Sequence, residues 1–223
     1  MKNLLYPMVL TGLLMSFTAC GPKWSEVEKE GFNLVVNKGG QTLGYSPESG
    51  LTILTVDRYA FKDLNKNGEL DPYEDWRLSF DERAADLASK MTVEQMAGLM
   101  LYSGHQRIPG GGFGRGGTYN EKPFEESGAL ASDLSDQQKE FLTNDNLRHV
   151  LITSVESPEV AAQWNNNAQA LVEGLGLGIP ANNSSDPRHQ ADNDEEYTLG
   201  AGGAISNLPN AIGLAASFYA ERL

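Results

Sequence analysis

Side chains that carry oxygen recur at fixed positions in a twelve-residue stretch that begins at Asp63. Gly68 holds the sixth position, where a metal-binding loop must turn sharply with φ > 0. Hard oxygen ligands in this number and order suit Ca²⁺ better than zinc or copper. The candidate ligands are the side chains of Asp63, Asn65, Asn67, Asp71 and Glu74, with the backbone carbonyl of Glu69. The alternative is a solvated acidic turn, but several positions match one spacing at once, which favours calcium.

Polar side chains also follow a predicted strand near the end of the chain. Residues 149–155 form a nearly unbroken apolar run, which is typical of a strand buried on both faces. A helical segment follows, and residues 179–183 predict a second strand, so the three elements predict a βαβ unit with a parallel sheet. Functional groups gather at the carboxyl ends of such strands, where Asp186, Arg188 and His189 stand. The alternative for Asp186 is a turn residue that binds nothing.

The helices that must position these groups begin at recognisable caps. Capping boxes pair Ser79 with Glu82, Thr92 with Gln95, and Ser135 with Gln138, and Ser157 precedes Pro158 at the start of a fourth helix. Apolar side chains at helical spacing predict the buried faces. These side chains are Ala84, Leu87, Ala88 and Met91; Met96, Leu99 and Met100; and Val160, Trp164, Ala168, Leu171 and Val172. We assign the methionines to packing rather than to a cofactor site.

The part of the chain before the calcium loop predicts a short β element. Residues 21–36 are polar and acidic and predict a tether that ends in a strand at 32–36. Residues 51–56 are rich in β-branched side chains and predict a second strand. Further on, the glycine-rich residues 109–117 contain a formal G-x-G-x-x-G, but no strand-to-helix junction surrounds them. We therefore interpret them as a loop and not as a nucleotide site.

The first twenty residues predict an export signal. Lys2 supplies a positive start, residues 4–17 are mostly apolar, and small residues precede Cys20, the one cysteine of the chain. This ending resembles the lipobox of bacterial lipoproteins, in which the cysteine carries the lipid; the alternative is a plain secretory signal. We expect an exported protein, in the periplasm or at the outer membrane, that contacts membrane only through an N-terminal lipid anchor. The net charge of −13 makes nucleic acid an unsuitable partner.

Four segments together resemble glycoside hydrolase family 3, the β-glucosidase and β-xylosidase family. They are residues 85–100 (ADLASKMTVEQMAGLM), 177–180 (LGIP), 186–189 (DPRH) and 208–218 (LPNAIGLAASF). The resemblance implies an α/β fold that forms the first third or so of a (β/α)₈ barrel of the TIM type. It also implies that Asp186 binds sugar hydroxyls, with Arg188 and His189 in the same pocket. The expected partner is then a β-linked glucoside or xyloside oligosaccharide.

These inferences divide the chain into four parts. They are a signal at 1–20, a tether and β lead-in at 21–62, an EF-hand-like calcium loop at 63–74 and a partial barrel at 75–223. The family's nucleophile and acid/base lie beyond the matched segments, so we expect the N-terminal portion of a longer hydrolase, with structural calcium and no catalysis of its own. The alternative is a non-catalytic, calcium-stabilised surface lipoprotein that binds glycans or proteins.

Overall fold

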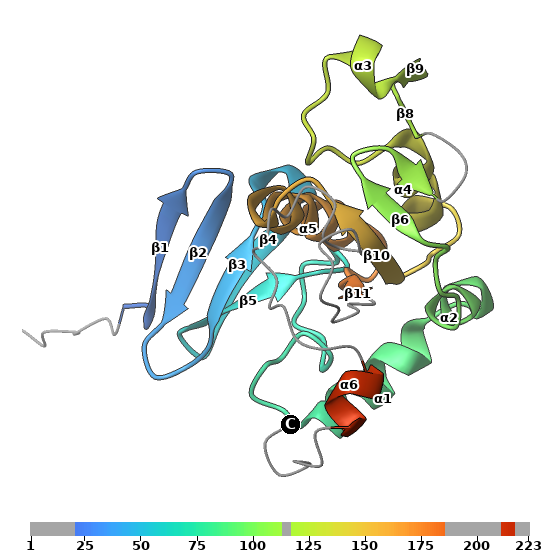
Figure 1. The fold of residues 1–223 in the computed structure, drawn as a ribbon. Coiled ribbons are helices and arrows are strands. Elements are labelled where there is room, and N and C mark those ends of the chain that lie inside the picture. The colour runs from blue at the N-terminus through green and yellow to red at the C-terminus, as the bar shows by residue number, and fades with distance from the viewer. Residues whose placement is uncertain (1–20, 113–116, 186–210, 217–223) are drawn as a thin grey trace, which may run out of the picture.

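The computed structural model describes residues 21–112, 117–185 and 211–216 (Figure 1). This part of the chain is mixed α/β: antiparallel hairpins come first, and a small parallel sheet with helices follows. The last described element is α6 (Ala211–Ala216).

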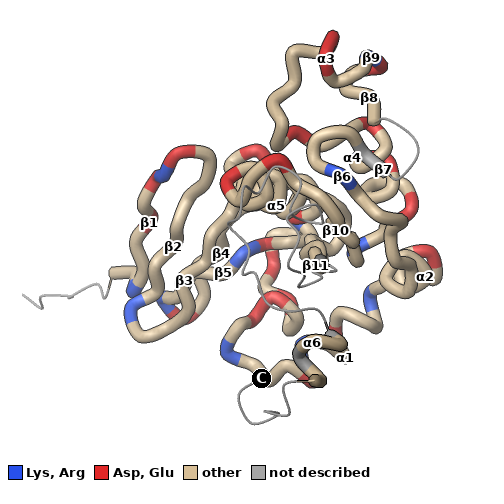
Figure 2. The backbone as a smooth tube through the Cα atoms, viewed as in Figure 1, with Lys and Arg blue, Asp and Glu red and all other residues tan. Residues whose placement is uncertain are grey.

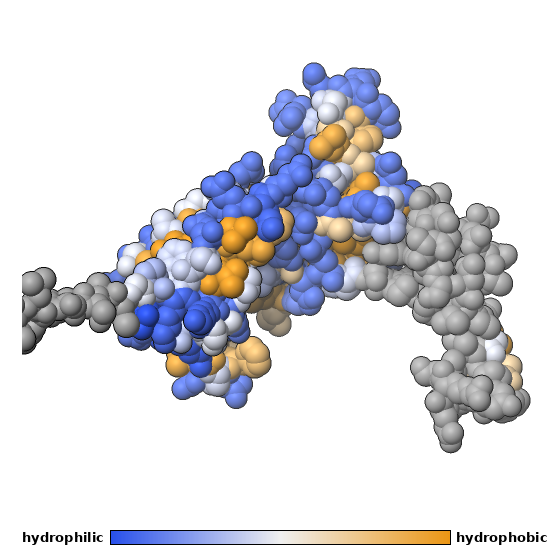
Figure 3. Space-filling view, turned by 90° about the vertical axis from the view of Figure 1, so that its left-hand side faces the viewer, coloured by the Kyte–Doolittle hydropathy of each residue, from blue (hydrophilic) through white to orange (hydrophobic). Residues whose placement is uncertain are grey.

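The described chain begins with a three-stranded antiparallel sheet. β1 (Trp24–Lys29), β2 (Phe32–Asn37) and β3 (Thr42–Tyr45) pair in that order, and Gly31 takes φ 81° in the first turn. β2 confirms the first predicted strand. The tether predicted for residues 21–36 is wrong, because its charged residues form β1, an edge strand whose side chains are mostly exposed. On the side of the molecule that carries β1, apolar patches are separated by polar residues (Figure 3).

A second hairpin leads directly into the calcium-loop candidate. A 3₁₀ turn, η1 (Pro47–Ser49), precedes β4 (Thr52–Val56), which confirms the second predicted strand, and β4 pairs with β5 (Tyr59–Asp63). Asn37 joins this hairpin to the first sheet, since its side-chain oxygen accepts the Ala60 N–H at 2.7 Å and its amide donates to the Ala60 carbonyl at 3.1 Å. β5 therefore ends at the first candidate metal ligand.

Three helices begin at the predicted capping boxes, with both reciprocal hydrogen bonds present in each box. They are α1 (Phe80–Lys90), α2 (Val93–Leu99) and α4 (Asp136–Thr143). The predicted burial of the first two is wrong for most positions: α1 has no buried residue, and Met100 is 88% exposed. Ala84, Ala88 and Met96 are also exposed, and Leu87, Met91 and Leu99 are partly buried. α2 packs through Gly98 instead, where a Cβ would lie 2.5 Å from the carbonyl oxygen of Asn146.

A four-stranded sheet with the order β11–β10–β6–β7 forms the centre of the α/β part. β10 (His149–Val155) runs parallel to β6 (Gln106–Ile108) and β11 (Asn182–Ser185), whereas β7 (Gly111–Gly112) is antiparallel to β6. The βαβ unit is thus confirmed, with its second strand beginning three residues later than predicted. The loop interpretation of the glycine-rich segment is wrong in part, because its first four residues form the turn of the β6–β7 hairpin and β7 itself. The described strands form an open sheet and not a closed barrel.

The core lies between this sheet and α5 (Pro158–Glu173). Trp164, Ala168 and Val172 of α5 are fully buried, which confirms the predicted stripe. They pack with Val150 and Ile152 of β10 in the main apolar cluster of the described residues. Because successive strand residues alternate between the two faces of a sheet, the other face of β10 points away from α5.

A small projection extends from the α/β part near α4 (Figure 1). It contains the hairpin β8 (Thr118–Tyr119) and β9 (Lys122–Pro123), followed by α3 (Phe124–Ser127), none of which the sequence predicted. Asp136, the first residue of α4, accepts hydrogen bonds from the Thr118 hydroxyl at 2.8 Å and from the N–H groups of Asn120 and Glu121 at 3.0 and 2.8 Å. One carboxylate thus ties the hairpin to the helix.

Candidate metal loop and strand-end site

The candidate metal loop runs from the end of β5 toward α1, and acidic positions recur along it (Figure 2). Lys66 and Gly68 take φ 60° and 81°, so the chain turns sharply where the sequence predicted a glycine turn. Asp63 is 2% exposed, and its two carboxylate oxygens accept the N–H groups of Asn67 and Gly68, each at 3.0 Å. The first candidate ligand therefore also closes the turn.

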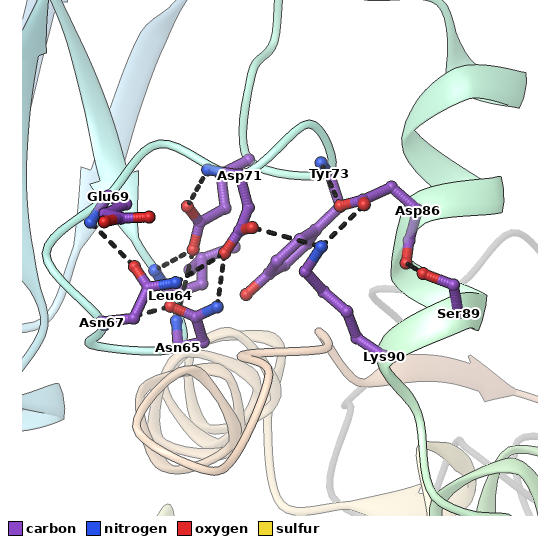
Figure 4. A network of polar contacts seen from close by, with 10 residues as sticks. Leu64, Asn65, Asn67, Glu69, Asp71, Tyr73, Asp86, Ser89 and Lys90 are labelled. Atoms are coloured by element: carbon purple, nitrogen blue, oxygen red, sulfur yellow. Dashed lines mark hydrogen bonds and ion pairs between the residues drawn. The ribbon is translucent and has the colours of Figure 1, made fainter.

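Two asparagines bring their amides to the carboxylate of Asp71 (Figure 4). Asn65 and Asn67 donate to Asp71 Oδ2 at 2.6 and 2.9 Å, and Lys90 of α1 lies 3.2 Å from Oδ1. Lys90 also pairs with Asp86 at 2.7 Å. Burial alone would raise the pKa of Asp71, but the hydrogen bonds from Asn65, Lys90 and Asn67 hold it below its ordinary value.

Glu74 closes the loop from inside the molecule. It is 5% exposed, and its Oε1 accepts the N–H groups of Leu64 and Asn65 at 2.7 and 3.3 Å, while Oε2 accepts the N–H of Asp71 at 3.1 Å. Burial raises the pKa of Glu74 and outweighs these hydrogen bonds, which lower it.

The neighbouring Tyr73 is also 5% exposed, but its hydroxyl has no partner at hydrogen-bonding geometry among the described residues. Burial raises the pKa of Tyr73, and so do the charge of Glu74, the close approach of the Glu74 carboxylate to the hydroxyl, and the charges of Asp71 and Asp63. In Figure 4 the ring runs beneath Asp71 and the hydroxyl points toward the loop. A buried polar group without a partner is unusual in a folded protein and needs an explanation.

The side chains of the loop carry the oxygen atoms that calcium prefers, and several of them lie within hydrogen-bonding distance of one another. They are not assembled as a ready site, since no three acidic, His or Cys side chains among the described residues form a metal-binding group. The reason is that the three carboxylates face N–H donors of the loop, and the amide nitrogens of Asn65 and Asn67 face Asp71. An amide that turns by half a rotation presents its oxygen in place of its nitrogen.

The loop also contacts the end of α5. Lys66 donates to the carbonyl oxygens of Ser49 and Gly174 at 2.9 and 3.1 Å. Nearby, Glu173 accepts the N–H of Ser46 at 3.1 Å and forms an ion pair with Lys62. The loop is thus located where the β lead-in meets the α/β part.

The strand-end candidates Asp186, Arg188 and His189 lie outside the described residues, as does Cys20. The structure describes the strand that precedes them, and β11 ends at Ser185. β6, β10 and β11 run in one direction, so their carboxyl ends lie at one edge of the sheet. None of the described helices is long and apolar enough to cross a membrane.

The sheet face turned away from α5 carries polar groups that the sequence did not single out. Tyr102 shares a hydrogen bond with Ser184, and His149 meets the amide of Asn182 at 3.1 Å. His149 and Asn182 are cross-strand partners, as are Leu151 and Ser184, so these side chains share one face. The unbroken run of polar residues in β11 was the signal that could have found them.

No protein-family model matches the chain. Three curated proteins are similar to it over most of its length. One is a periplasmic β-glucosidase/β-xylosidase of Dickeya chrysanthemi, to which the chain is 36% identical over 168 residues. This alignment covers 75% of this chain and 23% of that protein. The chain is 29% identical over 183 residues to a probable β-glucosidase C of Aspergillus oryzae (78% and 26%), and 27% identical over 154 residues to a β-glucosidase C of Emericella nidulans (69% and 22%). The chain spans about a quarter of the length of these relatives.

Proposed function

We propose that the chain is the amino-terminal part of an exported, retaining β-glycosidase of glycoside hydrolase family 3. Its substrates would be terminal β-linked glucosides or xylosides. The observation that carries the proposal is the 36% identity over 168 residues to the Dickeya chrysanthemi protein, whose name states β-glucosidase and β-xylosidase. Export is supported by the word periplasmic in that name and by the apolar leader that ends at Cys20, to which we assign the lipid anchor.

The parallel sheet supports a sugar-binding role for the segment after β11. In the sequence Asp186 directly follows Ser185, the last described residue of that strand, and ligands bind at the carboxyl ends of the strands in parallel α/β sheets. A carboxylate accepts hydrogen bonds from two vicinal sugar hydroxyls, and its charge strengthens both of them. Arg188 and His189 would line the same pocket and hold the carboxylate or the sugar in place.

Retaining hydrolysis needs a second set of groups. Two carboxylates about 5 Å apart act as nucleophile and as acid/base through a covalent glycosyl-enzyme. In the family that this chain resembles, both belong to segments beyond the matched residues. We therefore assign the hydrolysis to a protein that contains this chain and the rest of the catalytic domain, and the binding of one sugar unit to Asp186.

The test is hydrolysis of aryl β-glucosides and β-xylosides by the 223-residue chain and by the complete protein. We expect activity only in the complete protein. There, Asp186→Ala should lower kcat/KM by roughly a hundredfold or more, since two charge-assisted hydrogen bonds are lost. Asp81→Asn, at an exposed position of α1, is the matched control and should leave kcat/KM unchanged. An inactive complete protein would favour the glycan-binding lipoprotein, and activity of the chain itself would place the catalytic carboxylates within it.

A further inference from the structure

We infer that the loop from Asp63 to Glu74 binds one Ca²⁺ ion and that Lys90 of α1 competes with this ion for the carboxylate of Asp71. The inference concerns a binding site that the glycosidase reaction does not use, and it holds whether or not the proposed function is correct. It rests on the convergence of the loop's oxygen-bearing side chains, on the unpartnered Tyr73 hydroxyl and on the position of Lys90.

The convergence is the first observation. Asn65 and Asn67 approach the same oxygen of Asp71 at 2.6 and 2.9 Å, although the three residues come from different parts of the loop. Glu74 accepts the N–H of Asp71 at 3.1 Å. The side-chain oxygens of Asn65 and Asn67 accept the N–H groups of Asn67 and Glu69 at 3.1 and 2.8 Å. A rotation of the two amides would exchange these bonds for two neutral oxygens that point, with the Asp71 carboxylate, at one place, which is the kind of ligand set that calcium takes.

The second observation is the Tyr73 hydroxyl. It is buried, no described residue forms a hydrogen bond with it, and it points toward the loop (Figure 4). Calcium sites commonly keep water molecules among their ligands, and a water on the ion would give this hydroxyl an acceptor or a donor. The site thus accounts for a buried polar group that the contacts in the described part of the chain leave without a hydrogen-bond partner.

Lys90 is the third observation, and it predicts how affinity is set. Its ammonium group lies 3.2 Å from Asp71 Oδ1 and 2.7 Å from Asp86 Oδ1, so one positive charge already lies beside the loop (Figure 4). A cation entering the loop is repelled by this charge and shares one of its carboxylates. Removal of the charge should therefore tighten calcium binding. Asp86 would keep a partner, because it also accepts the N–H of Tyr73 at 3.1 Å.

The experiment is calorimetric titration of the chelator-treated full chain with Ca²⁺, together with Tb³⁺ luminescence sensitised by nearby aromatic rings. We expect one saturable Ca²⁺ per chain, with Mg²⁺ binding much more weakly. Glu74→Gln should weaken binding at least tenfold, and Lys90→Met should tighten it several-fold. Glu94→Gln removes an exposed acid on α2 outside the loop and should change nothing, which controls for diffuse attraction to the charge of −13.

Asp71→Asn, at a less buried loop position, keeps the test decisive if Glu74→Gln does not fold, and circular dichroism checks the fold of each variant. Absence of saturable binding, or binding that neither Glu74→Gln nor Asp71→Asn changes, would overturn the calcium site. An unchanged or weaker affinity in Lys90→Met would overturn the competition between Lys90 and the ion.

Discussion

The β lead-in, taken here together with the candidate metal loop as residues 21–78, and the described residues of the α/β part between 102 and 185 are held together in different ways. In the α/β part, α5 buries an apolar stripe against β10, and Trp164, Ala168 and Val172 are completely inaccessible. The α/β part also buries polar side chains, such as Gln106, Gln138 and Arg148. In the lead-in, however, polar or charged side chains make up a larger share of the buried ones, and each is matched to particular backbone groups. These side chains are Asn37, Ser46, Ser49, Asp63, Glu74 and Asp75.

The two regions also differ in the sequence distance of their contacts. Each lead-in hairpin pairs strands that are adjacent in the chain, so local turns decide the register. The parallel sheet joins distant segments, and Thr153 donates to the carbonyl of Gln106, 47 residues earlier. Apolar burial tolerates approximate geometry, whereas a buried hydrogen bond is lost completely when one partner goes. The lead-in should therefore depend on single polar atoms and the α/β part on volume.

The largest effect should come from Trp164→Ala. The substitution opens a cavity in the apolar cluster and should lower the free energy of unfolding by about 3–5 kcal/mol. It also removes the indole N–H that donates to Gln138 at 3.1 Å. Urea unfolding followed by circular dichroism measures the change. Phe80→Ala, at an aromatic residue that is 82% exposed, is the control and should change stability by less than about 0.5 kcal/mol.

A loss below about 1 kcal/mol in Trp164→Ala would break the comparison, because the α/β part would not then depend on its apolar volume.

The next effect should come from Asn37→Ala, which tests the polar side of the comparison. Asn37 is 3% exposed, and its loss leaves the Ala60 N–H without its acceptor and the Gln41 carbonyl without its donor. The Ala60 carbonyl keeps the indole N–H of Trp76 at 3.0 Å. We expect a loss of about 2 kcal/mol in the same unfolding experiment.

Asn166→Ala, at an exposed asparagine of α5, is the matched control and should be nearly neutral. If the two variants lose equal stability, the lead-in does not rest on the bonds of Asn37.

Local signals in the sequence predicted what local physics decides. The capping boxes at Ser79, Thr92 and Ser135 are present with both of their hydrogen bonds, because each box needs only residues three apart. The β10–α5–β11 unit was also predicted, since a buried strand and a long amphipathic helix leave strong patterns. The turn at Gly68 follows in the same way from the loop spacing.

Non-local packing decided the features that the sequence did not predict. The contact of α2 through Gly98 depends on the distant Asn146 backbone, which no helical periodicity encodes. Half of the β1 side chains are charged, and the segment becomes a strand because β2 offers it a partner. The burial of Tyr73 within the candidate metal loop is of the same kind, since its backbone is held against α1 by Asp86 and Arg83. The side chains at Asp186, Arg188 and His189 remain predictions from the sequence.

The smallest effect should be the pH dependence of stability in the projection. The projection belongs to the α/β part, but one charged side chain, Asp136, ties it to α4. The N–H of Glu121, with Thr118 and Asn120, holds the pKa of Asp136 below its ordinary value. A lowered folded pKa means that the bonds stabilise the protein fully above the unfolded value of about 4 and lose this effect as the pH falls through the folded value. Asp136→Asn should therefore cost about 1 kcal/mol at neutral pH and progressively less in acid.

The measurement is the free energy of unfolding of the wild type, Asp136→Asn and Glu140→Gln between pH 7 and pH 3. Glu140 is an exposed acid on the same helix and controls for the general effect of lost charge. If Asp136→Asn and Glu140→Gln follow the same pH dependence, the carboxylate contributes only diffuse charge. If the two variants differ in the free energy of unfolding at neutral pH and this difference disappears only in acid, a single carboxylate holds a hairpin in the α/β part, as the side chain of Asn37 is expected to do in the lead-in. The contrast between the two regions would then concern their cores alone.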